Sequence, residues 1–456
     1  MTLGKEDKMD VGLELAEFVG GLRWSELPGD VQDRARDRLL DALSTSAGTV
    51  TTGVEPAEAA ARTVAGDAGA GGHATQIGLG SGVPAERAAF VNGVTVHAIL
   101  FEDINLKSGD HPGAVVCPAA LAAAEDVDAS AETLLAAIVA GYEVQLYLGD
   151  VCADAVIARG FRTTSVFGTV GAAAAVAVAY GISGTVLENA LALAANAAFG
   201  LPQGWSEGTF EPYLEAGLAA ALGLWCVRMA QAGGLAARST FNGKTGYFNA
   251  YAGEASPGEH PLENAWRIRE ISAKTYPISG TKMTAVDSAL DIREKASPDP
   301  TRIERVEAIV PENVLHAGGP AMPPFANYIV AQDSAPFLIG AALAGKPMDS
   351  LPTYFSEFDD PLVAQVASKI VLIPEPGRRL ARLTVRMADG TEHESEVDNQ
   401  DAQVPSIAAM REKLATLATD LWGAGGVESI ADWASTADSA SARELGRLLR
   451  SIGDGR

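Results

Sequence analysis

Apolar residues recur at helical spacing over most of the first 265 positions of the chain. The segments with this spacing are 11–24, 30–47, 131–150, 167–182, 185–199 and 212–233. In the second of them Val31, Ala35 and Leu39 fall on one face, which is typical of a helix packed against a core. Glycine and proline separate the segments, and the Gly-rich stretch 66–82 is predicted to be a surface loop or a short turn of chain over the bundle. No strand is predicted before about residue 265. The pattern therefore predicts a large all-helical domain.

The apolar period becomes two after Trp266. The segments that alternate are 305–310, 369–373 and 382–387, followed by a polar return strand that ends near residue 397. Asp389-Gly390 is predicted as a two-residue hairpin turn between the last two. Helical spacing returns from Ser406 to about Leu449. The chain is therefore predicted to be mostly α, with an all-helical domain (1–265 and 401–456) and an inserted, smaller α+β lid domain (266–400).

One stretch, residues 90–117, combines a predicted helix with a loop whose side chains could take part in catalysis. Its helix is predicted to open at Pro84, to place Phe90, Val94 and His97 on one face, and to exit at Glu102 and Asp103. A loop of small and polar residues then leads to His111, and the next helix is predicted from Cys117. His97 suits either a satisfied core histidine or a substrate-binding group. His111 lies in a loop, where reactive groups concentrate, so it is a catalytic or binding candidate.

Charge narrows the range of partners. The chain has 456 residues, with 34 Lys and Arg against 58 Asp and Glu, giving a formal net charge of -24. Such a surface repels nucleic acids and anionic membranes, so neither is expected as a partner. The low aromatic content of 6% and the abundance of Ala and Gly indicate helices that approach one another closely. A helix-rich protein of enzyme size is expected.

The cysteines and the first residues of the sequence indicate the cellular compartment of the protein. Cys117, Cys152 and Cys226 lie in apolar segments without CxxC spacing, so we expect buried thiols in a reducing compartment. The first twelve residues are charged and do not resemble a signal peptide. The apolar run 166–182 is predicted to be a buried helix of a bundle. A cytoplasmic protein is expected.

A motif search indicates no cofactor. The sequence has no GxGxxG after a strand, and no Walker, HExxH, GxSxG or EF-hand pattern. Neither a nucleotide nor a metal is therefore expected. Chemistry would have to come from side chains, and proton transfer is the kind that needs only these.

The strings VNGVTVHAILFED and HPGAVVCPAALAAAE resemble the signature helix and loop of the MmgE/PrpD family, which includes 2-methylcitrate dehydratase, cis-aconitate decarboxylase and iminodisuccinate epimerase. Further similar strings follow in order: RLLDALSTSAG, GFRTTSVFGTVGAAAAVAVAYGI, LEAGLAAALG, KTYPISGTKMTAVDSAL and KIVLIPEPG. The resemblance covers nearly the whole chain. It implies a helical domain built from both chain ends, an α+β lid, a homodimer and a cofactor-free active site between the domains.

The resemblance also implies site residues, some of which are altered here. His111 before Pro-Gly and Lys274 before Tyr276-Pro are retained. An aspartate of the family is Leu100, and a histidine is Arg162. The other altered positions are Pro212, next to Glu211, and Gly280 and Met283, which flank Lys282. The tricarboxylate substrates of the family are therefore not carried over to this chain.

Roles follow from side-chain chemistry. Lys274, with Tyr276 nearby, would bind a substrate carboxylate or stabilise an enolate, unless it is simply exposed. Arg162 and Lys282 would form a carboxylate clamp or be solvated charges. Further candidates are His316 for binding, and Glu102 or Asp103 as a base, as groups that orient His111, or as the end of a helix.

These assignments predict general acid/base catalysis on a small carboxylate or carbonyl compound. With a leaving group beta to the abstracted proton the enzyme would be a lyase, of the dehydratase or decarboxylase kind. Without a leaving group it would be an epimerase or isomerase. A catalytically silent relative that acts as a binding partner is the third alternative.

Overall fold

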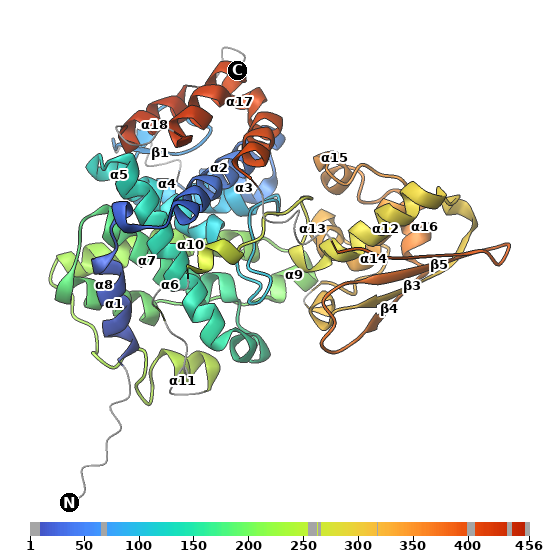
Figure 1. Ribbon diagram of the computed structural model, residues 1–456, viewed down its shortest axis with the longest axis horizontal. Helices are drawn as coiled ribbons and strands as arrows, with labels where there is room; N and C mark the ends of the chain where they lie inside the picture. Colours follow the sequence, from blue (N-terminus) through green and yellow to red (C-terminus); the bar gives the residue numbers. More distant parts are fainter. Residues whose placement is uncertain are drawn as a thin grey trace, which may run out of the picture.

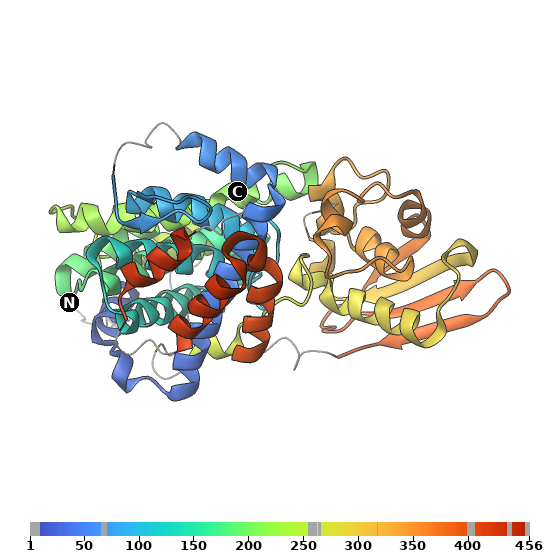
Figure 2. The same cartoon turned by 90° about the horizontal axis from the view of Figure 1, so that it is seen from above.

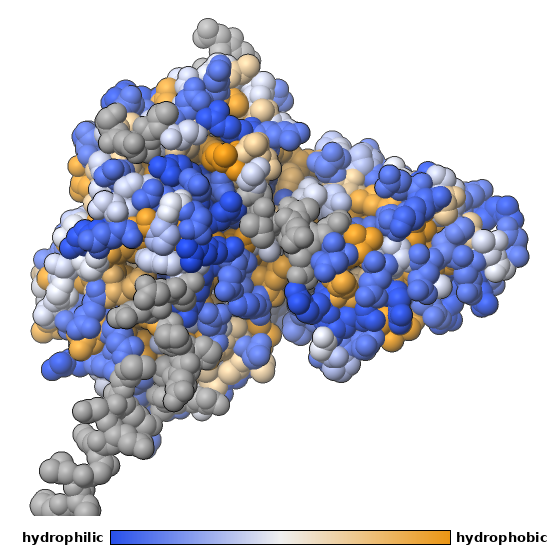
Figure 3. Space-filling model, in the orientation of Figure 1, coloured by the Kyte–Doolittle hydropathy of each residue, from blue (hydrophilic) through white to orange (hydrophobic). Residues whose placement is uncertain are grey.

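The computed structural model describes residues 10–64, 71–253, 262, 266–316, 318–398, 406–435 and 440–451. A large body of helices and a smaller body with a sheet lie side by side (Figure 1). The outline of the molecule narrows where the two bodies join (Figure 3). The predicted fold class is confirmed: the protein is mostly α, with an α+β domain inserted into a helical domain that both chain ends build.

Most of the helical domain precedes the insertion. Its helices are α1 (Val11–Gly21), α2 (Gly29–Thr52), α3 (Glu55–Thr63), α4 (Ala85–His97), α5 (Pro112–Val127), α6 (Ala131–Ala158), α7 (Thr163–Ala179), α8 (Gly184–Asn196), α9 (Gln203–Glu207), α10 (Glu211–Gln231) and α11 (Tyr247–Ala252). Helices α6 and α7 cross closely because they meet at glycines. A Cβ atom on Gly141 would lie 2.9 Å from the carbonyl oxygen of Gly171. The expected close approach of helices through small residues is therefore present.

Among the residues that the structure describes, two helices are long and apolar enough to span a membrane by length and composition alone. They are α6 and α10, and within the most apolar window of each, 89% and 61% of the residues are buried inside the protein. Helix α7, which covers most of the apolar run 166–182, is also buried. The core helices of a bundle pass the same test, so these two give weak evidence for a membrane span. All three cysteines are buried and free, as predicted.

The prediction of no strands before residue 265 was wrong. Strands β1 (Ala74–Thr75) and β2 (Gly82–Val83) pair antiparallel within the Gly-rich stretch. Two residues are too short to display a period of two, so the pattern along the chain could not reveal them.

The C-terminal helices return to the first domain. Helix α17 (Ile407–Ser435) packs along α2, and α18 (Ala442–Arg450) packs against α5, as Figures 1 and 2 show. Helix α17 breaks at Gly423, whose φ is 68°. The predicted return of the tail to the helical domain is confirmed.

The inserted domain carries a four-stranded sheet in the order β4-β3-β5-β6. Its strands are β3 (Ile303–Val310), β4 (Ile370–Pro374), β5 (Arg382–Met387) and β6 (Glu392–Glu396), and only the β3–β4 pair is parallel. Its helices are α12 (Met283–Ala296), α13 (Tyr328–Asp333), α14 (Ala335–Leu343), α15 (Leu351–Phe355) and α16 (Pro361–Ala367). They lie over one face of the sheet (Figure 1). Val306, Ala308 and Val310 are buried, as their alternation predicted.

The predicted two-residue hairpin turn is wrong by one residue. The amide of Met387 donates to the carbonyl of Thr391, so three residues connect the strands. Gly390 alone among them has a positive φ, of 85°, whereas the predicted turn needs two such residues. The carboxylate of Asp389 instead accepts a hydrogen bond from the Thr391 amide at 3.0 Å.

Each domain has a core of its own, and a third cluster, which includes Leu100 and Ile329, joins the two. Ile268, Ile271 and Ala273 belong to the core of the helical domain, and the core of the lid domain begins at Ile278. The chain therefore enters the lid a few residues after the predicted position 266. The predicted domain limits are at residues 265/266 and 400/401. The first adjoins residues 263–265 and the second falls within 399–405, and both of these ranges lie outside the described residues. Lys274 and Tyr276 lie on the connection itself.

Candidate active site

Helix α4 ends at His97, earlier than the apolar pattern suggests. Leu100 has a φ of 55°, a left-handed conformation that is uncommon for a leucine, and its amide donates to the carbonyl of His97. The chain turns back there, and Ile104 pairs with Ser272 in a short antiparallel bridge. Glu102 and Asp103 therefore lie in irregular backbone and do not end a helix.

The prediction that the next helix begins at Cys117 was also wrong. Helix α5 begins at Pro112, and His111 is its N-cap residue. Proline suits the first helical position because it has no amide hydrogen to satisfy there. The carboxylate of Asp103 accepts a hydrogen bond from the Gly113 amide at 2.9 Å, which satisfies another free amide of the first turn. His111 is thus fixed at the start of a rigid helix.

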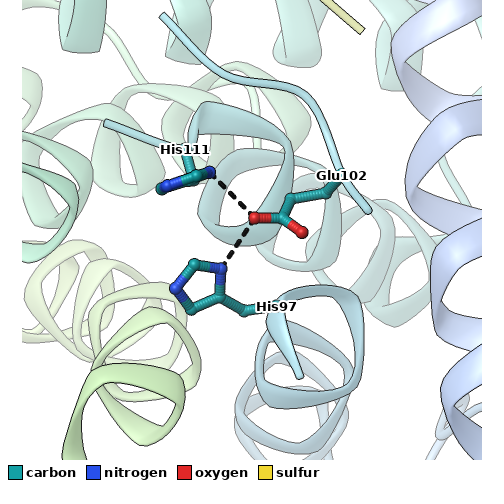
Figure 4. A group of neighbouring side chains, drawn as sticks. All are labelled: His97, Glu102 and His111. Atoms are coloured by element: carbon teal, nitrogen blue, oxygen red, sulfur yellow. Dashed lines mark hydrogen bonds and ion pairs between the residues drawn. The ribbon is translucent and has the colours of Figure 1, made fainter. Parts of the chain in front are cut away.

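His97, Glu102 and His111 form one cluster (Figure 4). Glu102 Oε1 lies 2.8 Å from the Nδ1 atoms of both histidines. Lys274 Nζ lies 3.3 Å from the same oxygen and donates to the carbonyl of Leu100 at 2.8 Å. Glu102 and Lys274 have no exposed side-chain surface. The cluster is therefore an ion pair, isolated from water, that also binds two imidazoles.

The partners of His111 decide which of its nitrogens carries the proton. Nδ1 faces Glu102 Oε1 at 2.8 Å and the carbonyl oxygen of Asp103 at 3.1 Å, and both oxygens can only accept. The hydrogen of the neutral ring is therefore on Nδ1, and Nε2 keeps its lone pair. His97 has the same tautomer, because its Nε2 lies 2.6 Å from the donor Arg162 Nη2.

Burial and neighbouring charges set the protonation states. Burial alone would raise the pKa of Glu102, but Lys274 and the two histidines hold that pKa well below its usual range. Burial and the nearby charge of Lys274 lower the pKa of His111. Burial lowers the pKa of His97 to about 3, and that of Lys274 below its usual value. At neutral pH the cluster contains a carboxylate and two neutral imidazoles.

Asp103 lies behind His111. Its carboxylate accepts from Tyr142 Oη at 2.6 Å and lies 3.5 Å from Arg38 Nη1. Burial raises its pKa to about 6. None of these contacts opens to the cavity described next, so Asp103 is placed to hold the loop and the start of α5.

A cavity of about 530 Å³ lies between the helical domain and the lid. Of the residues predicted from the sequence, those that line it are His111, Arg162, Lys282 and His316. Arg162 Nη1 lies 3.2 Å from Glu215 Oε2, and Lys282 Nζ lies 2.9 Å from Asp333 Oδ1. His316 is exposed at the edge. His111 is only 8% exposed, so its imidazole is the more enclosed of the two that line the cavity, the other being that of His316.

The other predicted residues stand behind the cavity wall. His97, Glu102, Asp103 and Lys274 support the lining residues and are not among them. Tyr276 points into the lid, where its hydroxyl donates to Asp287 Oδ1 at 3.1 Å. Lys274 is buried, which rules out its being merely an exposed lysine, and its ammonium group is directed at Glu102 rather than at the cavity.

Comparisons with known proteins agree with the motif resemblance. The family model for the MmgE/PrpD N-terminal domain matches residues 13–260, more than half of the chain. The chain belongs to the MmgE/PrpD family. A cis-aconitate decarboxylase-like protein, oryM, of Aspergillus oryzae is 28% identical over 66% of this chain and 65% of its own length.

Two mammalian members of the MmgE/PrpD family are also similar. The cis-aconitate decarboxylase of Homo sapiens is 30% identical over 52% of this chain and 51% of its own length. The enzyme of the same name from Mus musculus is 30% identical over 50% of this chain and 49% of its own length. The match thus spans about half to two thirds of each relative.

Several residues of this MmgE/PrpD site were not predicted from the sequence. Trp205 lines the cavity beneath the Arg162 guanidinium, 5.4 Å from it. Glu215 and Asp333 pair with the two cavity cations. Lys413 of α17 binds Asp41 Oδ1 at 2.6 Å and also the carbonyl of Phe101, the residue before Glu102. No local signal could have found Lys413, since 312 residues separate it from Phe101.

The same cluster has to be considered as a metal site. The ligand atoms of His97, Glu102 and His111 lie within 4.8 Å of one another, so among the described residues they form a group that could hold an ion. Two cationic side chains already adjoin it, Lys274 at 3.3 Å from Glu102 and Arg162 at 2.6 Å from His97. A divalent cation would be repelled by both. This donor set suits proton transfer better than metal binding.

Proposed function

We propose that the chain is a lyase that removes a proton alpha to a carboxylate or carbonyl group, with His111 as the general acid/base. One observation carries the proposal. Glu102 holds Nδ1 of His111 from behind, and that leaves the lone pair of Nε2 for a compound in the cavity. A base oriented in this way by a buried carboxylate is a recurring catalytic arrangement.

The residues suggest how the reaction proceeds. His111 Nε2 takes the alpha proton, and Glu102 stabilises the imidazolium that forms, because its carboxylate is 2.8 Å from Nδ1. Arg162 and Lys282 bind the substrate carboxylate and the negative charge that develops on it. The electron pair of the broken C–H bond then forms a double bond as a beta hydroxyl departs. The imidazolium returns its proton to that hydroxyl, so the products are an alkene and water.

Two alternatives use the same residues. If no leaving group is present, the proton returns to the carbon and the outcome is epimerisation or isomerisation. Decarboxylation would release carbon dioxide in place of a proton. His111 would then have to take a proton from water beforehand, so that the imidazolium could protonate the carbanion. The names of the relatives, all decarboxylases or decarboxylase-like, favour a lyase over an isomerase.

A catalytically silent protein is less well supported. His111 and Lys274 both contact Glu102 Oε1, at 2.8 and 3.3 Å, although 163 positions separate them in the sequence. Burying a lysine, a glutamate and two histidines together costs stability. Such a cost is expected where chemistry requires it.

Proton NMR in deuterated buffer tests the proposal. The protein would be incubated with 2-methylcitrate, citrate, cis-aconitate, iminodisuccinate and simpler 2-substituted or beta-keto acids. New alkene signals or loss of a carboxyl group would establish a lyase, and deuterium uptake without net change would indicate an epimerase.

His111→Gln should reduce the rate by about a hundred- to ten-thousandfold, whereas the exposed His73→Gln should leave it unchanged. An undiminished rate in His111→Gln would refute the assignment of the base. No reaction with any compound would favour the silent-protein alternative.

A further inference from the structure

Part of the lining that the helical domain contributes to the cavity is apolar, and we call this part the apolar wall. Ile104 and Leu106 of the loop after α4, together with Ile157 and Phe161 at the end of α6, form this wall. Ser279, Thr281, Lys282, Asn313 and Asp333 line the cavity from the lid. Its volume of about 530 Å³ is within the range of sites that enclose a whole organic ligand. A ligand that fills it would meet this apolar wall as well as polar groups from both domains, among them His111 and Arg162 of the helical domain.

The cations of the cavity are already neutralised. Arg162 is paired with Glu215 at 3.2 Å, and Lys282 with Asp333 at 2.9 Å. Lys107, at the rim, is largely exposed and contacts Glu270. A compound with three carboxylates would lose its hydration here without gaining an equal excess of positive charge, which is strongly unfavourable. One carboxylate can be shared between Arg162 and Lys282 at a much lower cost.

Asn313 indicates that the bound compound carries a hydrogen-bond donor. Its Oδ1 is buried and has no hydrogen-bond partner among the described residues. An acceptor in that state is costly unless a donor reaches it. A hydroxyl on the bound compound, near its carboxylate, would supply the donor.

We propose that the substrate is a hydroxy acid with a single carboxylate and an apolar chain or ring. The carboxylate lies toward Arg162 and Lys282, and the apolar part lies against Ile157 and Phe161. The inference rests on the proposed function only for the statement that the bound compound is a substrate. The binding preference itself follows from the cavity.

Calorimetric titration of the His111→Gln variant, in which we expect turnover to be at least about a hundredfold slower, tests this preference. The probes are butanoate, hexanoate, octanoate and the tricarboxylate tricarballylate. Affinity should rise by about fourfold for each added methylene until the apolar wall is covered. Tricarballylate should bind at least tenfold more weakly than hexanoate. A flat series, or tricarballylate as the tightest ligand, would overturn the proposal.

Variants of the apolar wall locate the effect. Ile157→Asn should abolish the gain from longer chains, and it adds no charge that would repel the carboxylate of the probe. Ile157→Phe, which is compatible with folding, should make octanoate bind more weakly than hexanoate. Ala155→Asn, on the same helix but not lining this cavity, is the matched control and should preserve the series. A series that survives all three substitutions would exclude this wall as the binding surface.

The two proposals can fail separately. A chain-length series without any turnover that depends on His111 would leave the binding preference intact and refute the proposed function. Turnover that depends on His111, with a flat series, would refute the preference alone.

Discussion

The buried pair of Glu102 and Lys274 allows a quantitative test of the site. Their charged atoms are 3.3 Å apart, and neither side chain has exposed surface. Coulomb's law at an effective dielectric constant of about 20 gives about 5 kcal/mol for two unit charges at this separation. Removing either partner leaves the other charge buried without its counter-ion, which typically costs about 3–5 kcal/mol.

A double-mutant cycle measures this coupling. Glu102→Gln and Lys274→Met should each lower the free energy of unfolding by about 3 kcal/mol or more. The double variant should lose clearly less than the sum, because it buries no unpaired charge, and a coupling energy of about 2–5 kcal/mol is expected. Catalysis should not recover in the double variant, since His111 still lacks the carboxylate on Nδ1.

Urea unfolding followed by circular dichroism gives the four free energies. Arg305 and Glu307 on β3 are 3.0 Å apart but about half exposed, so the corresponding cycle on this pair should show almost no coupling. If the losses from Glu102→Gln and Lys274→Met simply add, to within about 0.5 kcal/mol, the description of a buried ion pair is wrong. Lys274 can also shed its proton, because burial lowers its pKa. The cost of Glu102→Gln should therefore shrink as the pH rises.

Four further outcomes are expected. Lys413→Met should lower kcat by tenfold or more, because the carbonyl of Phe101, just before Glu102, loses its hydrogen bond to Lys413. Lys413→Arg should restore part of the loss. A kcat equal to that of the wild type in Lys413→Met would refute this positioning role. Burial and Lys274 lower the pKa of His111, so in a pH–rate profile kcat/KM should rise with pH along a limb below 6.5. Lys274→Met should move that limb to higher pH. A limb that does not move would refute the electrostatic coupling between Lys274 and His111. Burial raises the pKa values of four carboxyl groups to about 6 or 7, so these groups keep their protons to higher pH in the folded state than in the unfolded state. The stability that they contribute at acid pH is lost as the pH rises through that range. The melting temperature should therefore fall between about pH 5 and 7.5. These groups are Asp37, Asp103, Asp110 and Glu125. The predicted homodimer would use the exposed apolar face of α10, where the Trp225 side chain is 48% exposed. Trp225→Asp should therefore give a monomer in light scattering. A monomer in the wild-type protein would refute the dimer.

Much of the fold could be predicted because the hydrophobic pattern is strong there. Val306, Ala308 and Val310 alternate with less buried residues over the second half of β3, and the buried stripe of α2 includes Val31 and Leu39. The ends of elements were less accessible. Helix α4 stops at His97 because Leu100 takes a left-handed conformation, and a leucine gives no sign of that in the sequence.

The site was predictable only as a set of residue types. His111 was found because a histidine in a small polar loop suggests chemistry, and Lys274 because of the motif around it. That both meet one oxygen of Glu102 depends on the turn at Leu100 and on the path of the chain between the domains. Glu215 and Asp333, which neutralise the cavity cations, lie in segments with no feature that links them to Arg162 or Lys282.

The contact of α17 with the active-site loop has a consequence for biosynthesis. Lys413 reaches Asp41, 372 residues earlier in the chain, and the backbone just before Glu102. Closing so long a loop is slow compared with forming local helices. The inserted lid has its own core and is complete before α17 leaves the ribosome. The nascent chain would therefore carry a folded lid while the loop that holds Glu102 still lacks its contact with Lys413, so the protein would acquire activity only once α17 is made.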